Sequence, residues 1–209
     1  MDLADRLACM ELIQAWALYR DQGRWPELLE TFHPEGTIAV TWFAGPFNEF
    51  VARSQKAAQV AVATGSSSKH QIGWPIVSLA GDRAIAETNV SILGRQTLNG
   101  VQVDNISYGR FLDRLERRAG TWRILERVAV YEKDRLDPVI PGPAFERLMA
   151  ESDFSPYPEA YRFLAHRLVS AGRTLASPIL CHGSAETQAL YGRYQTWLRA
   201  DVDCPPNGR

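Results

Sequence analysis

Two side chains of this sequence have the types needed for acid–base chemistry at neutral pH, Asp21 and His70. An imidazole removes or donates a proton near neutrality because its ordinary pKa lies close to that pH. A carboxylate beside the imidazole fixes its tautomer and stabilises its charged form. Such a pair suits reactions through an enolate or quinone-methide-like intermediate, including elimination of water across adjacent carbons.

Each of the two residues also has a structural interpretation. Asp21 follows a predicted helix and precedes Gly23, and Asp side chains commonly accept hydrogen bonds from backbone donors in such turns. His70 opens a run of predicted strands, where its ring could bond to the backbone instead. If either residue is purely structural, the acid–base hypothesis loses its centre.

Helices and then strands must position these residues. Apolar residues at steps of three and four predict a helix over residues 2–19, a proline and acidic residues predict one over 26–32, and a third is predicted over 48–64. β-Branched and aromatic runs between glycine-containing turns predict a sheet. Its strands are expected at residues 37–43, 71–78, 83–97, 101–116 and 121–131. Helices followed by a strand meander indicate the α+β class.

The composition changes after Lys133. Prolines from Leu136 onward remove backbone donors, so the sheet is expected to stop there. Further helices are predicted over 145–149, 159–171 and 184–200. We expect residues 1–135 to form the core domain and residues 136–209 a helical C-terminal extension, packed on the core or on a partner subunit.

Short phrases along the chain resemble the SnoaL-like, scytalone-dehydratase-like family of the nuclear transport factor 2 fold, over roughly residues 3–135. The phrases are YRDQGRW from Tyr19, GTI from Gly36, KHQIG from Lys69, GDRAIAE from Gly81 and GTWRI from Gly120. The resemblance implies a cone-shaped barrel of a strongly bent, mainly antiparallel sheet, wrapped by the three N-terminal helices. It also implies an apolar small-molecule ligand in the mouth of the cone, and a homodimer or higher homo-oligomer.

The same resemblance implies that Asp21 and His70 lie together in the cavity as the catalytic pair. Some dehydratases of this type have a tyrosine five residues before the aspartate, where this chain has Trp16, and a second histidine near the positions of Gly94 and Arg95. The group that assists His70 therefore stays open among several polar and aromatic side chains. The candidate substrate-binding residues are Trp16, Tyr19, Trp42, Trp74, Asn89, Arg95, Tyr108 and Tyr131.

Strand alternation guides some of these choices. Trp42 and Phe43 are adjacent on a predicted strand and point to opposite faces, and we assign Trp42 to the pocket. Asn89 belongs to a polar face that could enter the concave side or face solvent. Trp74 could stack on an aromatic ligand or pack in the core, and Trp122 is assigned to the core.

Composition excludes several functional classes. The 209 residues carry 23 basic and 24 acidic side chains, so no net field would gather nucleic acid. No apolar run is long enough to span a membrane, and the first residues lack a secretory signal, so a cytoplasmic location is expected. Cys9, Cys181 and Cys204 are interpreted as free thiols. We expect no metal, because Cys181 and His182 lack further ligands, and no nucleotide cofactor, because no glycine-rich phosphate loop is present.

The sequence therefore favours a cofactor-independent, dehydratase-type lyase. Its expected substrate is a hydroxylated aromatic, polycyclic or steroid-like small molecule, with His70 as base and Asp21 as the orienting carboxylate. One alternative is a related formaldehyde-releasing lyase or an isomerase acting on a phenolic substrate. Another is a non-catalytic small-molecule-binding or assembly protein, because one fold hosts many functions. A close contact between Asp21 and His70 favours the enzyme, and its absence favours the binding protein.

Overall fold

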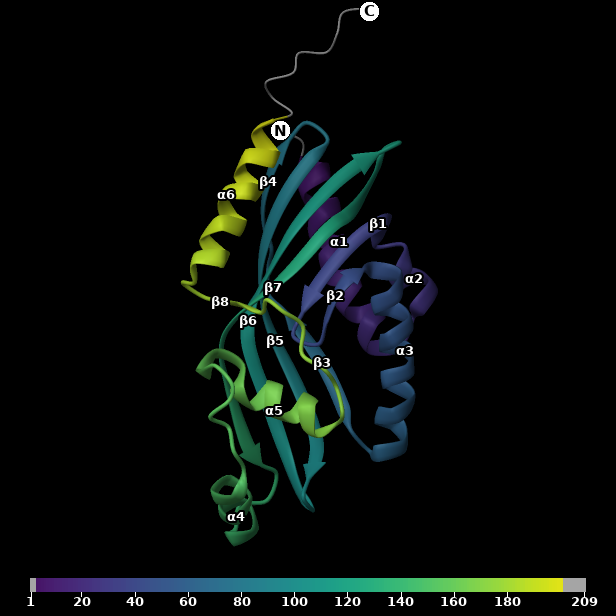
Figure 1. The fold of residues 1–209 in the computed structure, drawn as a ribbon. Helices are drawn as coiled ribbons and strands as arrows, with labels where there is room; N and C mark the ends of the chain where they lie inside the picture. The colour runs from purple at the N-terminus through teal and green to yellow at the C-terminus, as the bar shows by residue number, and fades with distance from the viewer. Residues whose placement is uncertain (1–2, 201–209) are drawn as a thin grey trace, which may run out of the picture.

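The computed structural model describes residues 3–200, which form helices at both ends of the chain and a long sheet between them (Figure 1). Cys204 lies outside the described residues. The N-terminal elements are α1 (Leu3–Gln22), α2 (Trp25–Leu29), β1 (Phe32–Val40), β2 (Phe43–Pro46) and α3 (Phe47–Thr64). The central strands are β3 (Ser67–Ile72), β4 (Ile76–Ala80), β5 (Arg83–Leu98), β6 (Val101–Arg118) and β7 (Thr121–Pro138). The last elements are α4 (Pro143–Glu151), the 3-10 turn η1 (Glu159–Tyr161), α5 (Arg162–Ser170), β8 (Leu180–Cys181) and α6 (Ala185–Arg199).

The strands form one curled sheet in the order β2-β1-β7-β6-β5-β3, with β4 paired to the other part of β5 and β8 paired to β7. All pairs are antiparallel except β1 with β7 and β7 with β8. The expected α+β class, with helices wrapped on a bent and mainly antiparallel sheet, is confirmed. The sheet does not close into a full barrel within the described residues, because the edge strands β2 and β3 do not pair with each other.

Strand boundaries differ from the sequence prediction at several places: β1 begins earlier than the strand expected at 37–43, β2 follows it as a separate strand, and β8 was not expected. The strand expected at 71–78 is two strands, β3 and β4, separated by Gly73-Trp74-Pro75, where the proline has no backbone N–H to donate. The sheet also continues past Lys133, because β7 runs on to Pro138 and pairs with the start of β6. Pro138 is the last residue of the strand, so its missing donor does not interrupt the ladder.

The two faces of the sheet are covered by different helices. One face, called the inner face below, carries Ala86, Val90 and Phe111 and packs in one cluster with Ile13 and Trp16 of α1. The opposite, outer face carries Leu112, Val128 and Val130, which pack against Leu190 and Tyr194 of α6. Trp122 is buried as predicted, with its indole N–H bonded to Asp5.

Residues after β7 contact both faces. Leu164, Ala165 and Leu168 of α5 belong to the inner-face cluster, and α4 packs through Leu148 against Val103 at the start of β6. The chain then passes β8 and continues as α6 on the outer face (Figure 1). The division into residues 1–135 and 136–209 stays a prediction, as does packing of the extension on a partner subunit.

Candidate active site

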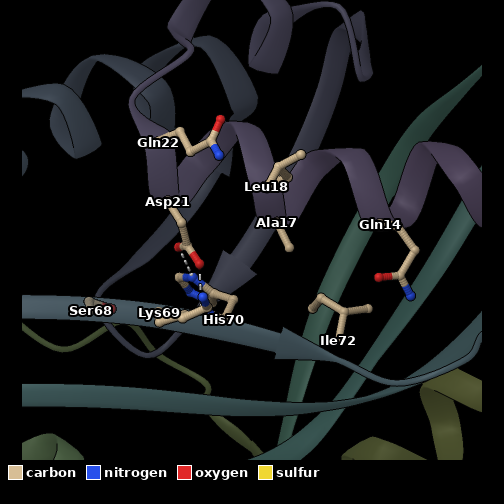
Figure 2. Close-up of a pocket in the computed structure, with 9 residues that line it drawn as sticks. All are labelled: Gln14, Ala17, Leu18, Asp21, Gln22, Ser68, Lys69, His70 and Ile72. Atoms are coloured by element: carbon tan, nitrogen blue, oxygen red, sulfur yellow. Dashed lines mark hydrogen bonds and ion pairs between the residues drawn. The ribbon is translucent and has the colours of Figure 1, made fainter.

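Asp21 in the last turn of α1 and His70 in β3 are hydrogen-bonded to each other twice. Asp21 Oδ1 lies 2.7 Å from His70 Nδ1, and Asp21 Oδ2 accepts the backbone N–H of His70 at 2.7 Å (Figure 2). Both side chains are largely buried, with 15% of the Asp21 side chain and 11% of the His70 side chain exposed. The carboxylate therefore holds both the imidazole ring and the strand that carries it.

This arrangement assigns distinct roles to the two ring nitrogens. An ionised carboxylate only accepts hydrogen bonds, so Nδ1 carries the hydrogen and Nε2 keeps its lone pair. Burial lowers the pKa of His70, the hydrogen bond and charge of Asp21 oppose that shift, and the charges of Arg20 and Arg127 add to it. The imidazole is consequently neutral at pH 7, which is the state a general base needs.

A cation and two aromatic rings lie behind the histidine. The Trp16 ring meets the His70 ring edge-on, with centroids 5.5 Å apart. The Arg127 guanidinium lies 4.4 Å from the centroid of Trp16 and 4.5 Å from that of Phe111. Arg127 donates to both carboxylate oxygens of Asp113 at 2.7 and 2.8 Å, and both side chains are fully buried. This pair fixes a positive charge beneath the aromatic wall of the site.

Sequence reasoning missed Arg127 and Asp113. The two residues are direct cross-strand partners in β6 and β7, and Asp113 shares its face with Phe111 and Leu115. The available signal was an acidic and a basic residue at strand positions where alternation places core residues. Without the register of the two strands, that signal could not pair them.

A groove of about 340 Å³ opens between α1 and β3 beside the Asp21–His70 pair, called the dyad below. Figure 2 shows Asp21 on the helix pointing to His70 on the strand, with Gln14 and Ile72 further along the same groove. Its lining residues are Gln14, Ala17, Leu18, Asp21, Gln22, Ser68, Lys69, His70 and Ile72. The dyad is thus reached from the groove, while the imidazole ring of His70 packs against Trp16.

Four of the candidate substrate-binding residues pack in or against the inner-face cluster. Trp16 and Tyr131 are buried, and Tyr19 and Trp42 are partly buried against the same cluster. Trp42 stacks on Phe50 at 5.2 Å between centroids, whereas the Tyr131 hydroxyl accepts the backbone N–H of Thr41. Of these four, Trp16 is the one whose ring contacts that of His70 within residues 3–200.

The other four candidates are not brought to the dyad. His70 is paired with Ile92, so the inner positions of β5 are Val90, Ile92 and Gly94, and strand alternation directs Asn89 and Arg95 outward. Asn89 is exposed, and Arg95 forms a bidentate ion pair with Asp104. Tyr108 faces outward with Lys133 over its ring, and Trp74 is 74% exposed. Of the two orientations left open for the polar face of β5, the structure shows the outward one, and the face of Thr88 and Val90 turns to the inner side.

A family model described as a SnoaL-like domain matches residues 1–128. "Pea pathogenicity protein 2" of Fusarium vanettenii is 28% identical over 165 residues, which cover 78% of this chain and 68% of that protein. An uncharacterized protein of Emericella nidulans, AN9274, is 26% identical over 170 residues, covering 78% of this chain and 69% of its own.

Solved structures share the fold. The structure of LinA superposes with a TM-score of 0.51 at 17% identity, covering 68% of this chain and 96% of that one. The Kfla4162 protein of Kribbella flavida gives a TM-score of 0.50 at 18% identity, covering 68% and 95%. No helix within residues 3–200 combines the length and apolar character needed to cross a bilayer.

Proposed function

The chain belongs to the family of SnoaL-like domains, with the nuclear transport factor 2 fold that the sequence resemblance implied, and from this premise we propose that it is a cofactor-independent lyase. The proposed substrate is a hydroxylated aromatic, polycyclic or steroid-like small molecule. The default reaction is elimination of water, with His70 as the proton-transferring group and Asp21 as its orienting carboxylate.

The contact between Asp21 and His70 is the observation that carries this proposal. Two hydrogen bonds of 2.7 Å fix the imidazole, and burial favours its neutral form, whose Nε2 lone pair can accept a proton. His70 Nε2 makes no hydrogen bond to any of the described residues, so its lone pair can meet a substrate proton. A binding protein would not need a buried imidazole held in one tautomer.

His70 Nε2 removes a proton from a carbon beside a carbonyl group or an aromatic ring, and the electron pair of that C–H bond moves into an enolate or quinone-methide-like intermediate. Asp21 stabilises the imidazolium that forms. The electron pair then forms the new carbon–carbon double bond as the C–O bond breaks, and His70 returns the proton to the departing hydroxyl group as water leaves.

Trp16 is our candidate for the group that assists this step. It replaces the tyrosine that some dehydratases carry at this position, and its indole N–H is buried without a hydrogen-bond partner in residues 3–200. A buried donor with no partner costs free energy, so a substrate oxygen bound there would satisfy it. We assign Trp16 the role of donor to a carbonyl or phenolate oxygen of the substrate. Formaldehyde release and a double-bond shift in a phenolic substrate use the same proton transfer and stay alternatives.

The test is a lyase assay of the wild-type protein and His70→Gln on hydroxylated aromatic and steroid-like compounds, following loss of water by mass spectrometry. We expect turnover by the wild type and its loss in His70→Gln, by about 10⁴-fold or more. His182→Gln is the matched control, because His182 is exposed and packs against Arg110 outside the groove. Turnover by a folded His70→Gln protein equal to that of the wild type would contradict the proposal.

A further inference from the structure

Besides Arg162 at the start of α5, three partly buried arginines have no carboxylate at ion-pair distance within residues 3–200. They are Arg20 of α1, Arg167 of α5 and Arg173 in the segment after α5. Within residues 3–200 no carboxylate oxygen lies within ion-pair distance of their guanidinium groups, whereas Arg95, Arg114 and others are paired. The Nε atoms of Arg20 and Arg167 are buried with no hydrogen-bond partner in that range. An uncompensated guanidinium away from water is costly, so its retention requires an explanation.

Arg167 lies on the inner face of the sheet, over Gly94 of β5. Its Nη1 is 3.0 Å from the point a Cβ would occupy on Gly94, so the missing side chain of Gly94 makes room for the guanidinium. Gly94 is paired with Ser68, which precedes His70 by two residues on the same face of β3. Residues two apart on a strand are separated by about 7 Å. The guanidinium therefore packs over Gly94, which lies two residues along β5 from Ile92, the partner of His70.

Arg173 and Arg20 approach the same region from other sides. The Arg173 guanidinium lies 4.9 Å from the centroid of Trp42, whose ring stacks on Phe50 at 5.2 Å. Phe50 in turn stacks with Trp16, the ring that contacts His70. Arg20 directly precedes Asp21 in α1. Three separate elements thus each supply a guanidinium, and the charge of Arg173 acts on both of the others.

The charges of these arginines also act on one another. Burial lowers the pKa of Arg20 and of Arg173, and it lowers the pKa of Arg167 to about 10. The charge of Arg173 contributes to the lowered pKa of both Arg20 and Arg167. All three remain protonated at pH 7, and their mutual repulsion would be relieved by an anion between them.

We propose that Arg20, Arg167 and Arg173 form an anion subsite that binds a carboxylate substituent on the ring system of the substrate. Guanidinium groups bind carboxylates bidentately, and the rings beside them suit an aromatic body attached to that carboxylate. Two of the three arginines follow residue 128, where the family match ends, so the C-terminal extension supplies the subsite. This inference rests on the proposed function insofar as the bound molecule is a substrate, but the anion binding can be measured without any reaction.

The test compares binding of 1-naphthoate with that of the neutral, isosteric 1-naphthamide by isothermal titration calorimetry. The wild-type protein is expected to bind naphthoate about 10- to 100-fold more tightly, because hydrogen bonds to charged groups are the stronger ones. Arg167→Gln and Arg173→Gln are each expected to reduce that preference about tenfold, and Arg167→Lys to restore part of it. Arg147→Gln is the matched control, since Arg147 is an exposed arginine of the same extension.

Equal affinity of the wild type for the two probes would overturn the inference, as would an unchanged preference in folded Arg167→Gln and Arg173→Gln proteins. If one variant fails to fold, the other still decides the question. His70→Gln should keep the preference for naphthoate. A preference for naphthoate together with no lyase activity would support the subsite and count against the proposed reaction, whereas His70-dependent turnover with no preference would do the reverse.

Discussion

At the scale of single residues, the site depends on how one carboxylate divides its two oxygens. Asp21 Oδ1 holds the ring of His70, and Oδ2 holds the backbone N–H of the same residue. The structural and catalytic interpretations of Asp21 are therefore compatible, because the residue accepts a backbone hydrogen bond and orients an imidazole at once. A substitution of Asp21 must affect both the position and the basicity of His70.

The pH dependence of the proposed reaction tests this coupling. Burial lowers the pKa of His70 below its ordinary value of 6.5, and Asp21 acts in the raising direction. A general base must be unprotonated, so kcat/KM should fall as pH decreases through a midpoint below 6.5. In Asp21→Asn the midpoint should shift lower still and kcat should drop by roughly 10⁴-fold. The measurement is a pH–rate profile of both proteins, and a wild-type midpoint above 6.5 would contradict the assigned role.

At the scale of elements, the long strands β5, β6 and β7 place the site by alternation and by an irregularity. The register of β6 with β7 shifts between Tyr108 and Gly109, so β7 contains one extra residue there. Gly109 sits at that shift, and a Cβ on it would lie 2.3 Å from the carbonyl oxygen of Val130. The irregular pairing therefore requires a residue without a side chain, as expected where two backbones approach closely.

Two glycine substitutions test this requirement by opposite outcomes. Gly109→Ala should lower the free energy of unfolding by about 3 kcal/mol, because backbone must move to relieve the overlap. Gly192→Ala is the matched control on α6, where a Cβ would meet nothing within 4 Å. It should raise the free energy of unfolding by about 1 kcal/mol, because alanine favours a helix interior more than glycine does. Urea denaturation measures both, and a Gly109→Ala protein as stable as the wild type would show that the strands pair differently.

At the scale of the whole molecule, the chain after β7 holds the sheet from both faces. α5 contributes Leu164 and Leu168 to the inner-face cluster, and α6 contributes Leu190 and Tyr194 to the outer one. Tyr191 adds a hydrogen bond from its hydroxyl to Glu87 of β5 at 2.5 Å. Because these contacts join the extension to the central strands, the two parts should unfold together.

Unfolding of a variant in α6 tests that expectation. Leu190→Ala removes a buried side chain and should lower the free energy of unfolding by about 2–5 kcal/mol, within a single cooperative transition. Gln188→Ala is the matched control, because Gln188 is exposed on the same helix. Calorimetry should show one transition shifted to lower temperature in Leu190→Ala. Two transitions, only one of them shifted, would mean that the extension folds as a separate unit.

The expected cytoplasmic location and homo-oligomeric state stay predictions, and so does the identity of the substrate. Oligomeric state depends on complementary surfaces between subunits, which no local sequence pattern describes. Cys9 and Cys181 are free thiols, as interpreted from their number and spacing. These features concern the whole molecule and depend on contacts between distant parts of the chain.

The sequence predicted most helices and strands in the right order, because hydrophobic periodicity and glycine-containing turns are local signals, but it missed β2, β8 and the break between β3 and β4. It also indicated Asp21 and His70, through short phrases that resemble a family, and their contact was then found at 2.7 Å. Only the tertiary structure decided which face of each strand meets the site, since one unknown register separates an inward Thr88 from an outward Asn89. The buried Arg127–Asp113 pair and the three unpaired arginines were likewise decided by packing between elements far apart in the chain.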